Sequence, residues 1–439
     1  MEADIEALIL TFVIGTVLWS FLITLYRKNR ISTRHIIVLL ALIGIILRII
    51  FAAETPIGMN SDEPAHYNYI SYISTNYSLP VFEIVEPETM EYEYYQPPVY
   101  YLLLTPIHWI ANKAGVETNN IYLMLRAANI LIWLLTFILS VKTFKRLGWF
   151  EKQQIPAFGS LAIISLLPHY ISISSGINNS NLPILFITCV SYYLAHDKIR
   201  NRQWAIIGLL VGLTVLTKMS GGVVGIFVAA YIIYGYYINQ QTLRDTVLAS
   251  LTSGGIAIGL WSIRAARNIH YHNEAILVEM GSRLWENPPR MLSDTVILFL
   301  TELTDTFWAS SGPVLQFRLS GIAIGGVLWT FAIIGHIDSI ISQNELFSGK
   351  ISQQWFISGV FMLIANLLAI FRMADQVGNV QGRFLFPSLL FVGIITAVGL
   401  REFGLQTKIM PIHFVGGMTL YAILFTVHRF TQSSVGIFF

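Results

Sequence analysis

The chain has 439 residues, of which 54% are hydrophobic and only 12% are charged. The formal net charge is +2, and the basic residues are scattered singly instead of forming a stripe, which gives no sign of a nucleic-acid partner. Cys189 is the only cysteine, so an intrachain disulfide and a zinc site built from cysteines are excluded.

Apolar runs of about twenty residues recur along the chain, the length that crosses a bilayer as a helix. They lack the alternation of barrel strands. The sequence therefore predicts an all-α integral membrane protein that forms a single polytopic domain over residues 1–439. We expect about twelve transmembrane helices, at 5–26, 36–54, 121–142, 155–173, 180–196, 204–217, 221–238, 246–264, 320–341, 352–371, 384–400 and 409–428.

Charge at the ends of these runs predicts the topology. The segment 1–35 is acidic before its apolar run and basic after it, the reverse of a cleavable signal peptide, so we expect a retained extra helix and a basic inner loop. With the N-terminus outside, most Lys and Arg fall in short inner loops, as in cytoplasmic loops. The short runs 204–217 and 221–238 are separated only by KMSGG, and merging them would invert everything downstream.

Two long outer loops are expected, at 55–120 and 265–319. The stretch QPPVYYLLLTPIHWIANKAG, residues 96–115, has three prolines and several aromatic residues, which suits helices that lie on the membrane surface. No soluble domain or internal repeat is evident. The chemistry is therefore expected where the outer loops meet the helix ends.

The first outer loop begins with MNSDEPAHYNYI, which carries Asp62, Glu63 and His66. An acid just outside a membrane helix can act as a general base toward an acceptor hydroxyl. Neighbouring carboxylates or His66 could bind a divalent metal. Adjacent residues diverge by about 100° on a helix, so one acid is expected to be catalytic and the other supporting. The alternative is a plain helix start, with Ser61 or Asp62 as the N-cap.

Cations within or beside apolar runs are costly and are therefore functional candidates. Arg48 and Lys218 are of this kind, whereas snorkelling to lipid headgroups is the alternative for several arginines at outer helix ends. One base with several cations suits a substrate that carries a phosphate at the membrane surface. The arginines at outer helix ends are Arg264, Arg267, Arg372 and Arg383.

Several motifs follow one another along the chain: NSDEPAHY, YYQPPVYYLLL, SSGINNSNLPILF, GLTVLTKMSGG, WSIRAARNIHYHNE and QGRFLFPSLLFV. In this order they resemble membrane glycosyltransferases of the GT-C superfamily over about residues 36–400. The resemblance is strongest to the group of polyprenyl-phosphate-sugar-dependent enzymes that includes protein O-mannosyltransferases and the lipid A aminoarabinose transferase. Tyr95, Gln96 and Pro97 stand where the aminoarabinose transferases have Glu-Lys-Pro, so the chain departs from them at the first two of these positions.

The resemblance implies an inverting hexosyl- or pentosyltransferase. It would move a sugar from a polyprenyl-phosphate donor to a hydroxyl of a glycan, lipid or protein on the outer or luminal side, as in glycosylation of the cell envelope. By position, Asp62 matches the catalytic base and Glu63 its neighbour, while Arg383 and Lys218 match sites near the donor phosphate. Arg372 and Arg267 are further candidates for binding the phosphate. The candidates for a supporting role are His66, Gln96, Tyr95 and Gln381.

Two other readings stay open. A transporter or flippase for lipid-linked saccharides would also have outer cations and broken helices, but it would need charged sites accessible from both faces. A polymerase or ligase with a lipid diphosphate donor differs only in the family pattern. No cofactor beyond a divalent metal is indicated. We expect an extracytoplasmic active site in the plasma membrane of a prokaryote.

Overall fold

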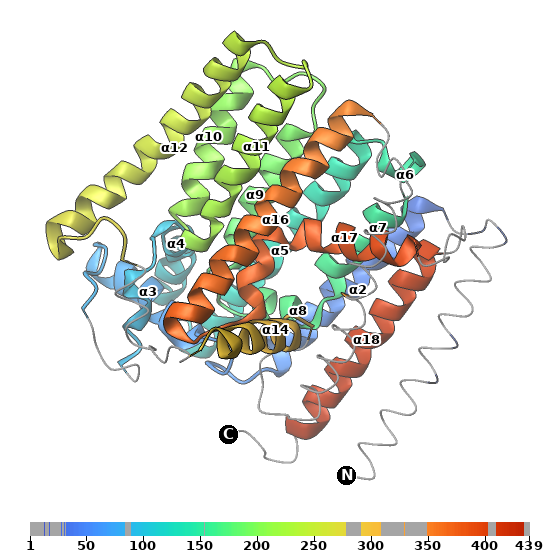
Figure 1. Cartoon of the computed structure of the whole chain (residues 1–439). Coiled ribbons are helices and arrows are strands. Elements are labelled where there is room, and N and C mark those ends of the chain that lie inside the picture. Colours follow the sequence, from blue (N-terminus) through green and yellow to red (C-terminus); the bar gives the residue numbers. More distant parts are fainter. Residues whose placement is uncertain are drawn as a thin grey trace.

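The computed structural model describes residues 32–83, 89–152, 154–277, 291–308, 349–402 and 410–433, with a few isolated positions between them. All regular structure in these ranges is helical (Figure 1). The expected spans 5–26 and 320–341 lie almost entirely outside the described residues. The predicted all-α class is therefore confirmed for the part of the chain that the structure describes.

The helices fall into two groups: those of one long assembly, and those in the segments that connect its members. The long assembly is built from α2 (Thr33–Glu54), α5 (Thr118–Arg146), α7 (Gln154–Leu166), α8 (Pro168–Ser175), α9 (Asn181–Leu194), α10 (Asn201–Val215), η3 (Met219–Val223), α11 (Val224–Tyr237), α12 (Leu243–His272), α16 (Lys350–Val377), η5 (Gly382–Ser388), α17 (Leu389–Glu402) and α18 (Met410–Ser433). The connections contain α3 (Glu63–Asn76), η2 (Tyr92–Tyr95), α4 (Val99–Lys113), α6 (Trp149–Lys152) and α14 (Leu292–Trp308).

Within the described residues, 6 helices are long and apolar enough to cross a membrane, and α7 with α8 makes a seventh if the pair, bent by 50°, is one span. Helices α9 and α10 have 14 and 15 residues, fewer than the roughly twenty that a bilayer needs. The chain is thus a multi-pass membrane protein. The expected total of about twelve spans stays a prediction.

The glycines of α10 reveal the direction of its neighbours. Gly208 lies against Ser253 of α12, and Gly212, four residues later, lies against Ala257, also four residues later. Because the residue numbers rise together, α10 and α12 run parallel, and α11, which joins them in the chain, must run in the opposite direction (Figure 1). The two short apolar runs are therefore separate helices, and a single merged span is excluded.

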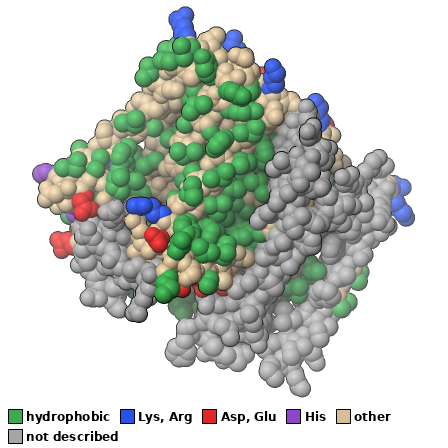
Figure 2. All heavy atoms as spheres, in the orientation of Figure 1, with side chains coloured by type: hydrophobic (Ala, Val, Ile, Leu, Met, Phe, Trp, Pro, Cys, Tyr) green, Lys and Arg blue, Asp and Glu red, His purple; other side chains and the backbone are tan. Residues whose placement is uncertain are grey.

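Basic helix ends gather at one end of the assembly. Arg146 at the end of α5 donates to the Tyr192 carbonyl of α9, and Gln354 at the start of α16 donates to the Tyr231 carbonyl of α11. Figure 2 shows most of the visible Lys and Arg along the upper edge, a broad hydrophobic band below it, and acidic side chains toward the lower edge. This separation matches the topology predicted from charge. Which end faces the cytoplasm stays a prediction.

Arg48, a functional candidate by its position in an apolar run, has a structural role instead. Helix α8 begins at Pro168, whose missing N–H leaves carbonyls of the preceding turn without helical partners. Nη1 of Arg48 donates to the Ser165 carbonyl at 2.8 Å, and Nη2 donates to the Ile164 carbonyl at 3.2 Å. The guanidinium also lies 3.8 Å from the ring centre of Trp133. The fully buried Arg48 therefore stabilises the bend between α7 and α8.

Helix α4 has the two-sided character expected of a helix on the membrane surface. Tyr100 and Leu104 are buried, whereas Leu103 and Ile110 on other faces are more than half exposed. Trp109 donates its indole N–H to the Tyr77 hydroxyl at the end of α3. Aromatic side chains with one polar end are typical of the membrane interface. Burial of α4 in lipid headgroups stays a prediction.

Candidate active site

Asp62 is the N-cap of α3, at the end of the turn that follows α2. Its φ of 58° lies in the left-handed region, which is uncommon for a residue with a side chain. The side chain makes no capping hydrogen bond, so it is not used as in a plain helix start. Its Oδ2 lies 2.6 Å from Nη1 of Arg383, and its Oδ1 accepts a hydrogen bond of 3.3 Å from the Tyr92 hydroxyl. With 24% of the side chain exposed, Asp62 is accessible to a substrate.

Glu63 points the other way, into the protein. It is fully buried in a two-pronged ion pair with Arg126 of α5, with distances of 2.8 and 2.6 Å. The backbone N–H groups of Gly58 and Ile177 also donate to this carboxylate. The two acids therefore diverge, as expected for neighbours at a helix start. Glu63 fixes the turn that presents Asp62, and this anchoring holds the unusual backbone conformation in place.

Lys218 and Arg383 lie near Asp62 although they come from different parts of the chain. Lys218 follows α10, and its Nζ donates to Asn179 Oδ1 at 3.1 Å and to Ser180 Oγ at 2.9 Å. Arg383 lies in η5, and its Nη1 also donates to Ser61 Oγ at 2.8 Å. The Nε of Arg383 is buried and has no hydrogen-bond partner among the residues that the structure describes. The site therefore has two cations with donors that could turn toward an anionic ligand.

The turn that carries Arg383 is fixed by α14. The Gly382 N–H donates to Thr306 Oγ1 at 2.6 Å. A Cβ on Gly382 would lie 2.2 Å from the Phe307 backbone nitrogen, so the two backbones approach as closely as only glycine permits. The second outer loop thus sets the position of Arg383.

The charges of the site act on one another. Burial alone would raise the pKa of Asp62, but the positive charge of Arg383 and the hydrogen bond from it outweigh burial and lower that pKa below its usual range. Burial, followed by repulsion from Arg383, lowers the pKa of Lys218 to about 8. At neutral pH the site therefore contains an ionised carboxylate beside two cations.

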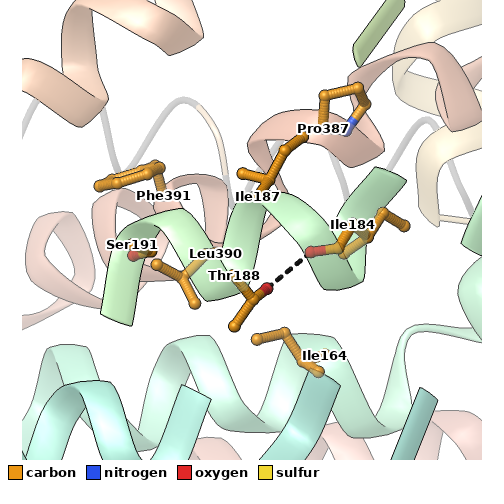
Figure 3. A pocket seen from close by; sticks show the side chains of 8 residues that line it. All are labelled: Ile164, Ile184, Ile187, Thr188, Ser191, Pro387, Leu390 and Phe391. Atoms are coloured by element: carbon orange, nitrogen blue, oxygen red, sulfur yellow. Dashed lines mark hydrogen bonds between the residues drawn. The ribbon is translucent and has the colours of Figure 1, made fainter. Parts of the chain in front are cut away.

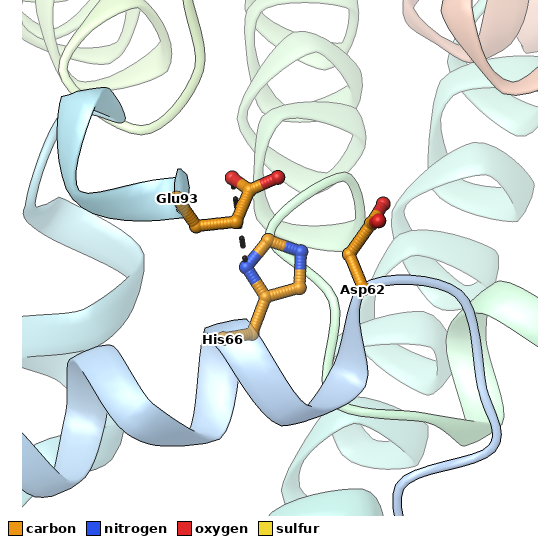
Figure 4. A group of neighbouring side chains, drawn as sticks. All are labelled: Asp62, His66 and Glu93. Carbon is orange, nitrogen blue, oxygen red and sulfur yellow. Dashed lines mark ion pairs between the residues drawn. The ribbon is translucent and has the colours of Figure 1, made fainter. Parts of the chain in front are cut away.

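Asp62, His66 and Glu93 form a group whose ligand atoms all lie within 4.8 Å of one another (Figure 4). His66 Nδ1 lies 3.0 Å from the Tyr101 hydroxyl and 4.0 Å from Glu93 Oε2, and that Glu93 oxygen is buried without a hydrogen-bond partner. Burial lowers the pKa of His66 to about 3, so its ring is neutral, the form that binds metals. Burial and the charge of Asp62 raise the pKa of Glu93 to about 7. The donor set fits a divalent metal.

Tyr95 and Gln96 follow Glu93 at two and three residues' distance in the chain. Gln96 Nε2 donates to the Tyr95 hydroxyl at 2.9 Å, and its backbone carbonyl accepts from the hydroxyl of Tyr69. Arg264 of α12, for which snorkelling was the alternative, is instead buried and donates to the carbonyls of Tyr95 and Gln96. Tyr95 and Gln96 therefore support the segment that carries Glu93.

Three other candidates are not brought to Asp62. Arg267 donates to the carbonyls of Leu79 and Pro80 and thus ties α12 to the first outer loop. Arg372 is exposed on α16. The side chain of Gln381 donates to Asn379 at 3.4 Å. Among the residues that the structure describes, none of these three side chains makes a hydrogen bond or ion pair with Asp62, His66 or Glu93.

Two residues of the site were not singled out from the sequence. Glu93 is one of several acids in the first outer loop, and its one distinguishing signal is its place within the aromatic run YEYY, just before the two prolines. Arg126 is a cation inside the apolar run 121–142, which is itself a functional signal. Both belong to elements that meet Asp62 only after the chain has folded.

A small pocket lies deeper, between α7, α9 and the start of α17 (Figure 3). Its walls are mostly apolar, and the Thr188 hydroxyl donates to the Ile184 carbonyl of its own helix. No titratable side chain lines it. It has no group that could carry the chemistry and is best described as a gap in the packing beside the η5 turn.

The structure thus defines a polytopic helical protein in which a loop carboxylate, Asp62, lies beside two partly buried cations, Arg383 and Lys218. Comparison with known proteins then shows what this arrangement is similar to. Residues 96–263 match the family model described as dolichyl-phosphate-mannose-protein mannosyltransferase. No curated protein matches the chain in a sequence search.

Solved structures share the fold at low sequence identity. ArnT from Cupriavidus metallidurans bound to undecaprenyl phosphate is 13% identical with a TM-score of 0.57, and the alignment covers 92% of this chain and 78% of ArnT. The oligosaccharyltransferase AglB from Archaeoglobus fulgidus, in complex with an inhibitory peptide and a dolichol-phosphate, is 14% identical with a TM-score of 0.55. That alignment covers 91% of this chain and 55% of AglB, so this chain spans about half of that enzyme.

The family match over residues 96–263 and the fold shared with ArnT and AglB agree with the resemblance to membrane glycosyltransferases seen in the sequence. The fold that this resemblance implies is thereby confirmed for the part of the chain that the structure describes.

Proposed function

We propose that the protein is an inverting glycosyltransferase that moves a sugar from a polyprenyl-phosphate donor to a hydroxyl of a glycan, lipid or protein. The observation that carries this proposal is the accessible carboxylate of Asp62 beside Arg383 and Lys218. The undecaprenyl phosphate in ArnT and the dolichol-phosphate in AglB support a lipid-phosphate donor. The sugar, a hexose or a pentose, is not specified by these residues.

The chemistry needs one base and a way to stabilise the leaving phosphate. The acceptor oxygen bonds to the anomeric carbon while the bond from that carbon to the phosphate oxygen breaks, and its electron pair goes to the phosphate. The acceptor proton goes to Asp62, which is ionised at neutral pH. The phosphate gains charge in the transition state, so Arg383 and Lys218 stabilise the transition state more than the ground state. No general acid is required.

Donor binding must rearrange the site, because Arg383 is now paired with Asp62. A phosphate between Arg383 and Lys218 would take over part of this pairing and leave Asp62 free to accept a proton. The buried Nε of Arg383, which has no partner, provides a further donor for that phosphate. Binding of the donor would therefore produce the form of Asp62 that can accept the acceptor's proton.

Asp62, His66 and Glu93 would hold a divalent metal if the enzyme uses one. Such an ion would supply Lewis-acid stabilisation of the developing phosphate charge. Elemental analysis of the purified protein tests this, because Glu93→Gln should lower the metal content of the folded protein. Equal metal content in the wild type and the variant would remove the site.

We place the reaction on the extracytoplasmic side of a prokaryotic plasma membrane, because α3, which begins at the Asp62 turn, lies toward the C-terminal end of α12, whereas the start of α12, which carries Arg244, lies at the opposite end of the helix assembly (Figure 1). Catalysis is tested with a panel of undecaprenyl-phosphate hexoses and pentoses and an alkyl glycoside as model acceptor. Asp62→Asn should abolish transfer and keep the melting temperature and undecaprenyl-phosphate binding. A variant that retained a large share of wild-type turnover would refute the role of Asp62.

A further inference from the structure

The two oxygens of Asp62 have different neighbours. Oδ2 faces Arg383 and accepts a hydrogen bond from Ser61 Oγ, whereas Oδ1 accepts one from the Tyr92 hydroxyl at 3.3 Å. If the donor phosphate binds on the Arg383 side, Oδ1 is the oxygen that remains for the acceptor proton. An acceptor hydroxyl must donate a hydrogen bond to the base before it reacts. The phenol of Tyr92 already makes such a bond.

The position of Tyr92 is set by its neighbours in η2. Asn68 of α3 donates to the Tyr94 hydroxyl, and Arg264 of α12 donates to the Tyr95 carbonyl. Tyr92 is only partly buried at the first position of this short helix. Its hydroxyl is the donor in the hydrogen bond to Asp62 Oδ1. The Tyr92 side chain can therefore cover Asp62 and can also rotate away from it, while its backbone stays in place.

We propose that Tyr92 occupies the place of the acceptor hydroxyl in the free enzyme and shields Oδ1 of Asp62 from water until the acceptor displaces it. This inference rests on the proposed function. Water at Oδ1 would be a competing nucleophile. Its oxygen would bond to the anomeric carbon, the bond to the phosphate oxygen would break with its electron pair on the phosphate, and the proton would go to Asp62. The donor would be lost as free sugar.

The experiment follows undecaprenyl-phosphate-sugar with and without the alkyl glycoside acceptor. Without acceptor, Tyr92→Ala should release free sugar at least about tenfold faster than the wild type, because the shield is gone. Tyr77→Ala is the matched control, since Tyr77 is 72% exposed at the other end of α3 and should leave hydrolysis unchanged.

Tyr92→Phe distinguishes a residue that shields Asp62 from one that orients Asp62 during the reaction. This test also holds if Tyr92→Ala does not fold. The ring stays in place, so hydrolysis should stay low. The acceptor KM should fall by about two- to tenfold, because no phenol competes for Oδ1. A residue that orients Asp62 during the reaction would instead lower kcat on loss of its hydroxyl.

Two results would overturn the proposal about Tyr92. One is wild-type hydrolysis in Tyr92→Ala while transfer continues, and the other is a lower kcat with unchanged acceptor KM in Tyr92→Phe. If neither the wild type nor any variant consumes any donor of the panel, the proposed function itself fails, and the role of Tyr92 fails with it.

Discussion

Two adjacent acids, Asp62 and Glu63, end in opposite environments. The chain alone predicts that they diverge, because neighbours at a helix start point about 100° apart. It does not predict which one faces inward, because that depends on Arg126, far along the chain and inside an apolar run. The structure resolves the choice by burying Glu63 against Arg126 and leaving Asp62 partly exposed.

Arg383 is expected to bind the donor phosphate, so its replacement should affect binding and rate together. Arg383→Ala should weaken undecaprenyl-phosphate binding and slow transfer, each by roughly tenfold or more, because hydrogen bonds to charged groups contribute about 1.5–3 kcal/mol. Arg383→Lys should restore part of this, since the planar fork is lost but the charge stays. A purely structural Arg383 would change the melting temperature and leave binding and turnover per folded molecule unaltered.

Glu63 is expected to act through the fold of its turn. Glu63→Gln leaves the guanidinium of Arg126 buried without a counter-charge, which costs roughly 3–5 kcal/mol of stability in comparable cases. The melting temperature should therefore fall far more than for Asp62→Asn, whose side chain is at the surface of the site. Similar melting temperatures for the two variants would contradict the assignment of Glu63 to the structure.

At the scale of elements, long-range contacts determine the positions of side chains that the local sequence does not predict. The apolar runs predict α2, α5, α12 and α16 well, because hydrophobic length is a local property. The sequence does not predict that α14 supplies Thr306 to the turn of Arg383, since that contact joins segments 76 residues apart. The same holds for Arg48, whose charge marks it as functional but whose partners are the carbonyls of a broken helix.

The contact between α14 and η5 predicts a sharp effect of one methyl group. Gly382→Ala would force apart the backbones of η5 and α14, move Arg383 and lower the affinity for undecaprenyl phosphate by about tenfold or more. Gly255→Ala is the matched control, because a Cβ there meets nothing within 4 Å. Equal phosphate affinities of the two folded variants would show that α14 does not position Arg383.

At the scale of the whole molecule, α3, which follows Asp62, lies toward the C-terminal end of α12, whereas the start of α12, which carries Arg244, lies at the opposite end of the helix assembly (Figure 1). Charge patterns predicted this separation because cytoplasmic loops of membrane proteins are enriched in Lys and Arg. The number of spans is harder to predict from the sequence, because helices such as α9 and α10 are shorter than the length that crosses a bilayer. Composition alone cannot show how such helices are packed.

Cysteine labelling in intact cells tests the orientation. In a chain with Cys189→Ser, a cysteine at Ser78 should react with a membrane-impermeant reagent, because Ser78 lies just after α3, at the same end of the helix assembly as Asp62. A cysteine at Arg202 should react only after the cells are opened. The reverse pattern would place the site at the cytoplasmic face.

The central claim is that a lipid phosphate binds between Arg383 and Lys218, next to Asp62. A structure of the protein determined with undecaprenyl phosphate tests it most directly. We predict phosphate oxygens within hydrogen-bond distance of Arg383 and Lys218, and an Asp62 carboxylate that is no longer paired with Nη1 of Arg383. A phosphate held elsewhere, with the ion pair of Asp62 and Arg383 intact at 2.6 Å, would contradict the account.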